Sequence, residues 1–245
     1  LIRGCVQAFP LMNPLGFESA LRHITLSGED LKRSFPGNAN GSLGERIAHK
    51  IFETIVRTEP DLVVDFHNDW IESIPYVLVD HDPGKQHNKA YRKAIHAAKQ
   101  AGMSIIVDEE EVHKSLSFNL LLRDIPALTF ELGKPNIVSE SYVTYGLEAV
   151  WNILADLDMI APRDKPFRYP LPPGYAHDKL LRYSDKPYGA KTGIIRFLAA
   201  PGDVVKTGQP LAKIVNAVGR SQETMTAVED GIVLGHSDSA VAFPG

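Results

Sequence analysis

The chain has 245 residues, enough for one large domain or two modest ones, and apolar residues make up 44% of it, enough for a full core. Charged residues make up 23%, as in ordinary soluble proteins, and the net charge of −4 gives no reason to expect nucleic acid or an anionic membrane as a partner. Cys5 is the only cysteine, so an internal disulfide and a cysteine-rich zinc site are excluded, and a reducing compartment, the cytoplasm, is expected.

The N-terminal part of the chain is predicted to be mostly loop. It opens at Leu1 on an apolar segment, without Met and without a signal-peptide pattern, so we expect that N-terminal sequence is missing. A strand is predicted at 4–12 and a turn at 13–16, where Asn-Pro-Leu-Gly stands. Residues 17–40 show no clean period. No apolar run of about 18 residues occurs, so no segment is expected to span a membrane.

A helix is predicted to begin after Ser42. Ser42 and Glu45 fit a capping box, in which each side chain accepts a hydrogen bond from the other residue's backbone N–H. Ile47, Ile51 and Ile55 recur every four residues, which predicts one buried stripe along this helix.

Strands and helices alternate along the next part of the chain. Strands are predicted at 61–67, 74–79, 104–107 and 126–132, and helices at 86–101 and 139–159. The last helix is predicted to be amphipathic, with Val143, Leu147 and Trp151 on one face. This alternation indicates a layered α/β domain with a mostly parallel sheet, covering residues 1–161.

Five prolines between Pro162 and Pro173 predict a stiff linker at 162–173. From 174 to 245 the helical period disappears, and short alternating segments are separated by Gly- and Pro-containing turns. We therefore expect a small all-β domain at 174–245.

Two ionisable side chains, His67 and Glu131, are expected at the carboxyl ends of strands, where open α/β sheets gather their ligands. A histidine there can equally be structural, and one histidine is no zinc site, because zinc hydrolases use about three protein ligands and a water. Asp65 either orients the imidazole ring or faces a helix. Glu131 stands in an apolar run, so it is either at the exposed end of its strand or held in a cleft as a general base.

A basic pair, Lys32 and Arg33, stands in a loop bounded by Gly and Pro. Such pairs are usually solvated. The functional alternative is a clamp for a carboxylate, for which arginine offers a bidentate fork. Arg22 in the same loop region is a candidate second cation.

Together these stretches resemble the succinylglutamate desuccinylase/aspartoacylase family of the zinc carboxypeptidase superfamily. The basic segment 30–37 reads Asp-Leu-Lys-Arg-Ser-Phe-Pro-Gly where the family has Asp-Leu-Asn-Arg-x-Phe-Pro-Gly. Asp-Phe-His at 65–67 stands where the family has Asp-Leu-His, and Phe-Glu-Leu-Gly at 130–133 stands where it has its catalytic glutamate. The features occur in the family's order.

The resemblance implies a zinc-dependent hydrolase that cleaves the amide of a small N-acyl amino acid or related carboxylated substrate. His67 would be the third zinc ligand, and Glu131 would activate the zinc-bound water and later protonate the leaving amine. Arg33 would bind the substrate carboxylate, with Lys32 beside it, and Arg22 would polarise the carbonyl group. The implied fold is a three-layer zinc-carboxypeptidase-like domain with a mostly parallel sheet, followed by a small barrel-sandwich domain.

The sequence departs from the family pattern in two ways. The family's first two zinc ligands lie in a His-Gly-x-Glu type motif before the Asn-Pro turn, and no such motif occurs here. Lys32 replaces the family's asparagine, which puts substrate preference in question. The alternatives are therefore a carboxypeptidase-like or esterase activity, or a degenerate zinc-free binding protein. Whether copies of the chain form a homo-oligomer is left open.

The C-terminal part also resembles biotinyl/lipoyl carrier domains, at 201–208 and 223–231. Carriers need a modifiable lysine near Met225, and the candidate position here is Thr226. We therefore expect a shared fold without the prosthetic group.

Overall fold

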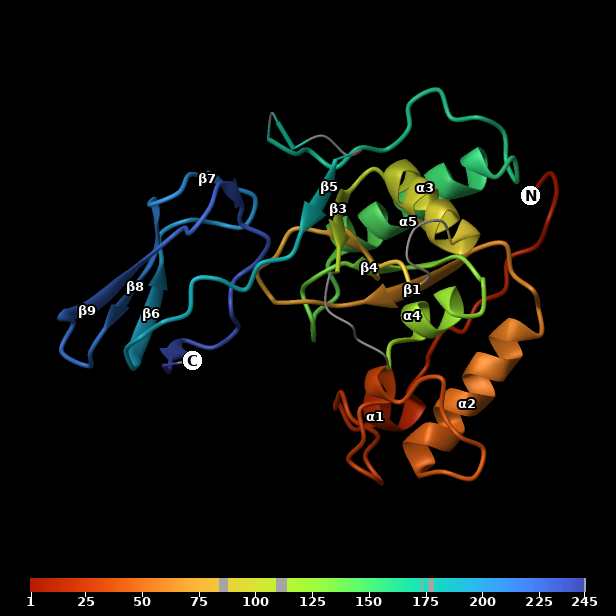
Figure 1. Cartoon of the computed structure of the whole chain (residues 1–245), viewed down its shortest axis with the longest axis horizontal. Helices are drawn as coiled ribbons and strands as arrows, with labels where there is room; N and C mark the ends of the chain where they lie inside the picture. The colour runs from red at the N-terminus through yellow and green to blue at the C-terminus, as the bar shows by residue number, and fades with distance from the viewer. Residues whose placement is uncertain (84–87, 109–113, 173, 176–178, 245) are drawn as a thin grey trace.

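The structure is a computed structural model that describes residues 1–83, 88–108, 114–172, 174–175 and 179–244. An α/β domain holds a five-stranded sheet between two layers of helices, and a β-rich module follows at one side (Figure 1). The helices of the two layers are α2 (Leu43–Val56) and α4 (Leu116–Leu121) on one face, and α3 (Lys89–Ala101) and α5 (Glu140–Asp156) on the other. The predicted three-layer fold class is confirmed.

The central sheet has the order β1-β4-β2-β3-β5. Its pairs are parallel except for β2 and β4, so the prediction of a mostly parallel sheet is also confirmed. β5 follows the proline-rich segment in the chain and yet pairs with β3, so residues beyond 174 complete the edge of this sheet. The strands are β1 (Val63–His67), β2 (Tyr76–Val79), β3 (Ser104–Val107), β4 (Ala127–Glu131) and β5 (Leu180–Arg182).

The two faces of the sheet differ in chemistry. Val77, Val79, Leu128 and Phe130 are fully buried on one face, against the alanine-rich side of α3 and against α5. Phe130 also meets Phe66 edge-on, with ring centroids 5.4 Å apart, a contact worth about 0.5–1.5 kcal/mol beyond its buried area. Because side chains alternate along a strand, the residues between these project to the opposite face, and several of them are polar.

Local signals at the helix ends are confirmed. Both hydrogen bonds of the capping box at Ser42 and Glu45 are present. α3 ends at Gly102, whose φ of 78° is a left-handed conformation that glycine adopts without strain. Residues 86–87, predicted as the start of α3, lie outside the described residues. The buried side of α2 is centred on Ala48 and Phe52, while Ile47 and Ile51 are only half-buried.

Three predictions about local structure are wrong. Residues 4–12 form no strand, because no described strand lies beside them to take up their backbone hydrogen bonds. The turn at 13–16 is the start of a short helix, α1 (Pro14–Glu18), because the Asn13 side chain accepts a hydrogen bond from the Gly16 N–H and Pro14 suits the first helical position. The apolar face of α5 is substantially exposed, at 45% for Val143 and 56% for Leu147.

The C-terminal module consists of antiparallel strands, and it docks on the loop that follows β1. Ser73 and Gly235 form a β-bridge, the Ile74 N–H donates to the Leu234 carbonyl at 3.0 Å, and the His236 N–H donates to the Glu72 carbonyl at 2.8 Å. No described helix is long and apolar enough to cross a membrane. The strands are β6 (Gly193–Phe197), β7 (Val204–Val205), β8 (Pro210–Val215), β9 (Ser221–Thr226), β10 (Gly231–Ile232) and β11 (Val241–Ala242).

Candidate active site

Two parallel strands bring the predicted catalytic side chains together. β1 and β4 pair so that His67 lies opposite Glu131 and Asp65 lies opposite Thr129. Paired residues share a face of the sheet, and so do residues two apart along a strand. All four side chains therefore project to the polar face, at the carboxyl ends of both strands.

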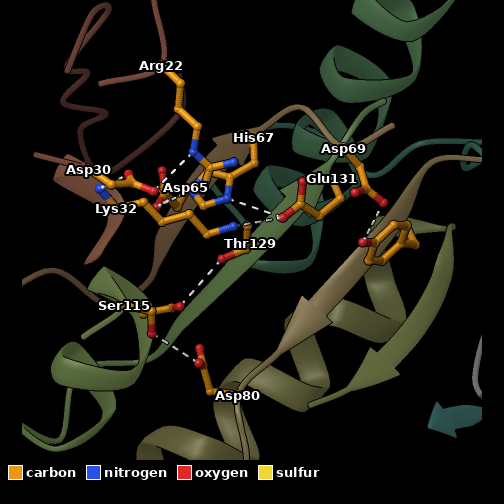
Figure 2. Close-up of polar contacts among 12 residues, drawn as sticks. Arg22, Asp30, Lys32, Asp65, His67, Asp69, Asp80, Ser115, Thr129 and Glu131 are labelled. Atoms are coloured by element: carbon orange, nitrogen blue, oxygen red, sulfur yellow. Dashed lines mark hydrogen bonds and ion pairs between the residues drawn. The ribbon is translucent and has the colours of Figure 1, made fainter. Parts of the chain in front are cut away.

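His67 lies between two carboxylates (Figure 2). Its Nδ1 is 3.2 Å from Glu131 Oε1, and its Nε2 is 3.0 Å from Asp65 Oδ2. Burial alone lowers the pKa of His67, but the hydrogen bonds to Asp65 and Glu131 outweigh it and raise the pKa to about 9. Both ring nitrogens thus lie within hydrogen-bonding distance of a carboxylate oxygen.

Glu131 is buried rather than at an exposed strand end, since only 4% of the residue is exposed. The Lys32 ammonium lies 3.6 Å from its Oε1. Its Oε2 is buried and has no hydrogen-bond partner among the described residues. Because an unsatisfied buried carboxylate oxygen is costly, this atom points to a water or a substrate atom at that position.

The predicted basic clamp stands on a single 3-10 turn, η1 (Leu31–Arg33). The Asp30 side chain caps this turn by accepting a hydrogen bond from the Lys32 backbone N–H at 3.0 Å. The same carboxylate accepts from Arg22 Nε and Nη2 at 3.0 and 2.9 Å (Figure 2). In the described part of the chain, no hydrogen bond or ion pair joins Arg22 to His67 or Glu131.

The loop around η1 is fixed by packing. Leu31 and Phe35 are buried in the cluster formed by α2 and α4. Gly37 follows with φ 83°, and a Cβ at this position would lie 2.2 Å from the His49 backbone nitrogen. Only glycine lets the loop lie this close to α2, and this contact holds Lys32 over the polar face.

A second, half-buried acid, Asp69, stands beyond His67. The Tyr76 hydroxyl donates to Asp69 Oδ2 at 2.8 Å. Burial raises the pKa of Asp69 to about 6, and the nearby charge of Glu131 adds to this effect, while the bond from Tyr76 opposes it. The sequence did not predict the contact between Tyr76 and Asp69. Tyr76 reaches this part of the sheet only because β2 pairs with β4 in an antiparallel manner, which puts Tyr76 opposite Glu131.

The described residues include a suitable type of zinc ligand but too few ligands for a complete zinc site. His67 is a suitable ligand with carboxylates on both sides, yet the described residues hold no group of three or more His, Cys, Asp or Glu that could hold a metal ion. A zinc hydrolase needs about three protein ligands.

Comparison with known proteins identifies the domain. Residues 2–157 match the model of the succinylglutamate desuccinylase/aspartoacylase catalytic domain. The chain belongs to the succinylglutamate desuccinylase/aspartoacylase family. The resemblance predicted from the motifs at 30–37, 65–67 and 130–133 is thereby confirmed.

Relatives in this family match almost the whole chain. The N-alpha-acetyl-L-2,4-diaminobutyric acid deacetylase of Halomonas elongata is 24% identical, and the match covers 95% of this chain and 67% of that protein. The product-bound structure of the ectoine utilization protein EutE (DoeB) from Ruegeria pomeroyi superposes with a TM-score of 0.77 at 20% identity, over 96% of this chain and 71% of the other. A succinylglutamate desuccinylase/aspartoacylase from Rhodobacter sphaeroides gives 0.76 at 21% identity, with the same coverage.

Proposed function

We propose that this protein is a zinc-dependent deacylase that hydrolyses the amide bond of a small N-acyl amino acid or related carboxylated substrate. The observation that carries the proposal is the buried Glu131 carboxylate, with one oxygen unsatisfied, beside His67 at the carboxyl ends of two parallel strands. The deacylases of the family, including the diaminobutyrate deacetylase, support this reaction class.

Glu131 is the proposed general base and acid. Its unsatisfied Oε2 takes a proton from a water that attacks the acyl carbon, and Glu131 then gives that proton to the amine nitrogen as the C–N bond breaks. The products are a carboxylic acid and a free amine. Zinc, with His67 as one ligand, would lower the pKa of its water and polarise the carbonyl group.

The basic residues of η1 are the proposed substrate clamp. Arg33 is exposed beside the site, and among the described residues no hydrogen bond or ion pair holds its guanidinium, which can therefore hold a carboxylate through two parallel hydrogen bonds. Lys32 lies 3.6 Å from Glu131 Oε1 and is proposed to contact the same substrate. Arg22 is proposed to stabilise the oxyanion after leaving Asp30, its present partner.

The test is amine release from N-acetyl amino acids by the zinc-supplemented protein and by its Glu131→Gln variant. We expect turnover to fall by roughly a hundredfold or more in the variant, with bound zinc unchanged. Glu229→Gln, on an exposed turn of the C-terminal module, is the matched control and should match the parent. Equal activity in Glu131→Gln would refute the general-base assignment.

A second candidate is a zinc-free protein that binds N-acyl amino acids without cleaving them. It is favoured because the described residues hold no group of three or more His, Cys, Asp or Glu that could hold a metal ion. Saturable binding of N-acetyl amino acids without amine release, with zinc supplied, would select it. If the protein is an enzyme, the same site would also suit ester hydrolysis or a carboxypeptidase-like reaction. The kcat/KM values for ester, peptide and N-acyl amino acid substrates distinguish these reactions.

The predictions about binding partners and cellular location stay predictions. They are a small-molecule substrate as partner, no nucleic acid, no membrane, and a cytoplasmic location inferred from the single cysteine. Self-association as a homo-oligomer is decided by measuring the mass in solution.

A further inference from the structure

Asp69 is an acidic side chain of the site that takes no part in the proposed reaction. It lines the same groove as Arg22, Lys32 and His67, two positions after His67. In Figure 2, Glu131 lies between Lys32 and Asp69. The charges of Glu131 and Lys32 both act on Asp69, in agreement with this arrangement. A ligand in the groove therefore has a carboxylate within reach on the far side of Glu131 from the lysine.

Tyr76 fixes the position of this carboxylate. Its hydroxyl donates to Asp69 Oδ2 at 2.8 Å. Tyr76 is itself only 5% exposed, and it stands opposite Glu131 because β2 pairs with β4. The residue that holds Asp69 and the proposed general base are thus neighbours on one face of the sheet. A carboxylate has about four acceptor positions, so the bond from Tyr76 leaves others for a ligand.

Two other acids of the groove already have charged or ionisable partners. Asp30 pairs with Arg22 at 2.9 Å, and Asp65 Oδ2 lies 3.0 Å from His67 Nε2. In contrast, no cation within the described ranges forms an ion pair with Asp69, and the tyrosine hydroxyl that it accepts from is neutral. A half-buried carboxylate of this kind is stabilised when a positively charged group of a ligand joins it.

Hydrolysis of an amide produces such a positively charged group. When the C–N bond breaks, Glu131 gives its proton to the amine nitrogen. The carboxylic acid product then ionises and its proton passes to the amine, so the final products are a carboxylate and an ammonium ion. The corresponding ester gives a carboxylate, a neutral alcohol and a proton released to water. The two reactions therefore differ in the charge of the leaving group.

We infer that Asp69 binds the amine that leaves and thereby favours amides over esters, with Tyr76 as its positioning residue. The inference rests on the proposed function and deepens it, because it names the residue that selects the bond to be cleaved. A separate sign of a ligand at this place is the buried, unsatisfied Oε2 of Glu131, on the strand that pairs with β1.

The direct test is calorimetric binding of L-2-aminobutyrate and of L-2-hydroxybutyrate to the zinc-supplemented protein. The two probes differ only in an α-ammonium or an α-hydroxyl group. We expect the amino acid to bind about tenfold or more tightly, the effect of one hydrogen bond between charged groups. Equal affinities, or no measurable binding of either probe at millimolar concentration, would overturn the inference.

Asp69→Asn identifies the residue responsible. It keeps a side-chain oxygen for the Tyr76 hydroxyl, and we expect it to reduce the affinity ratio of the two probes to about one. Asp185→Asn is the matched control, because Asp185 also accepts a hydrogen bond from a tyrosine hydroxyl, that of Tyr188, on an exposed segment. A ratio preserved in a folded Asp69→Asn protein, checked by circular dichroism, would contradict the role of Asp69.

Tyr76→Phe tests the positioning role by kinetics. It removes the hydroxyl that holds Asp69, so kcat/KM for N-acetyl-L-2-aminobutyrate should fall several-fold. The value for the matched ester, O-acetyl-L-2-hydroxybutyrate, should stay within about twofold of the parent. Tyr188→Phe is the control and should change neither value. Equal losses for the amide and the ester would show a merely structural role and contradict the inference.

Binding and hydrolysis fail independently in this design. Tighter binding of the amino acid without any amine release would leave the Asp69 site standing and remove the deacylase proposal. Amine release by the parent, together with an unchanged preference for amides in Asp69→Asn, would leave the deacylase proposal standing and remove the role of Asp69.

Discussion

The neighbours of His67 and Glu131 determine which hydrogen bonds and ion pairs these two side chains make. The imidazole is held by two carboxylates, and one of these belongs to the proposed base. The Lys32 ammonium, at 3.6 Å from Glu131, replaces the neutral amide that the family pattern carries there.

At the residue scale, the sharpest prediction concerns Arg33. Arg33→Ala removes the proposed fork for the substrate carboxylate, so KM should rise about tenfold or more, while Arg33→Lys, which keeps only a point charge, should recover part of this loss. Steady-state kinetics on an N-acetyl amino acid check this result. Arg46→Ala, an exposed cation on α2, is the control. An unchanged KM in Arg33→Ala would contradict the proposal that Arg33 binds the substrate carboxylate.

Some of the site follows from the chain alone, and some does not. His67 and Glu131 were predictable because each ends an apolar strand, and parallel strands end at one edge. Asp80 gives the same kind of signal, an acid directly after the apolar run of β2. Its place on the same cavity as His67 was not predictable, because the strand order that inserts β4 between β1 and β2 depends on tertiary packing.

At the scale of elements, Glu29 joins the loop that carries the basic clamp to the start of α2. Its carboxylate accepts hydrogen bonds from the Ser42 hydroxyl and from the Gly44 N–H, the latter at 2.9 Å. The bond from Ser42 comes first among the causes that lower the pKa of Glu29, followed by those from Ser27 and Gly44. A negative charge is also favourable at a helix N-terminus.

This pKa shift predicts a pH-dependent effect of Glu29→Gln. Because folding lowers the pKa from 4.5, the carboxylate stabilises the fold above that pH, and its contribution is lost as the pH falls through the folded-state pKa. The variant should therefore unfold at lower urea than the parent at pH 7, and the difference should shrink as the pH falls below 4.5. Glu229→Gln serves again as the control. A difference that stays constant with pH would contradict the role of the charge.

Elements with strong local signals were predicted correctly, and elements decided by packing were not. The capping box of α2 and the glycine that ends α3 are local, and both are present. The face of α5 was misjudged because its buried side is made by Gly146, Ala149 and Asn152. The small side chains on this side permit close packing, and the Asn152 side chain hydrogen-bonds the Phe167 backbone. The periodicity of the large apolar residues therefore did not indicate the buried side of α5.

At the scale of the whole molecule, the C-terminal module docks on the loop directly after β1, the strand that carries His67. We propose that this contact lets the module restrict the site to small substrates. Gly235 is central to the contact, because a Cβ there would lie 2.4 Å from Trp70 Cε3.

Gly235→Val should therefore displace the module. We expect trypsin to cleave after Lys191 several-fold faster than in the parent, and N-acetyl tripeptides to be hydrolysed better relative to N-acetyl amino acids. Gly231→Val, where a Cβ meets nothing within 4 Å, is the matched control. If trypsin cleaves faster but peptides are still excluded, the module does not limit access.

The central claim is that His67 belongs to a zinc-dependent deacylase, and zinc content tests it most directly. We would measure zinc per chain by elemental analysis in the full-length protein, purified without chelator and offered the metal, and in its His67→Ala and His49→Ala variants. We expect close to one zinc per chain in the parent and in His49→Ala, and much less in His67→Ala. A parent protein without zinc would contradict it and select the zinc-free binding protein instead.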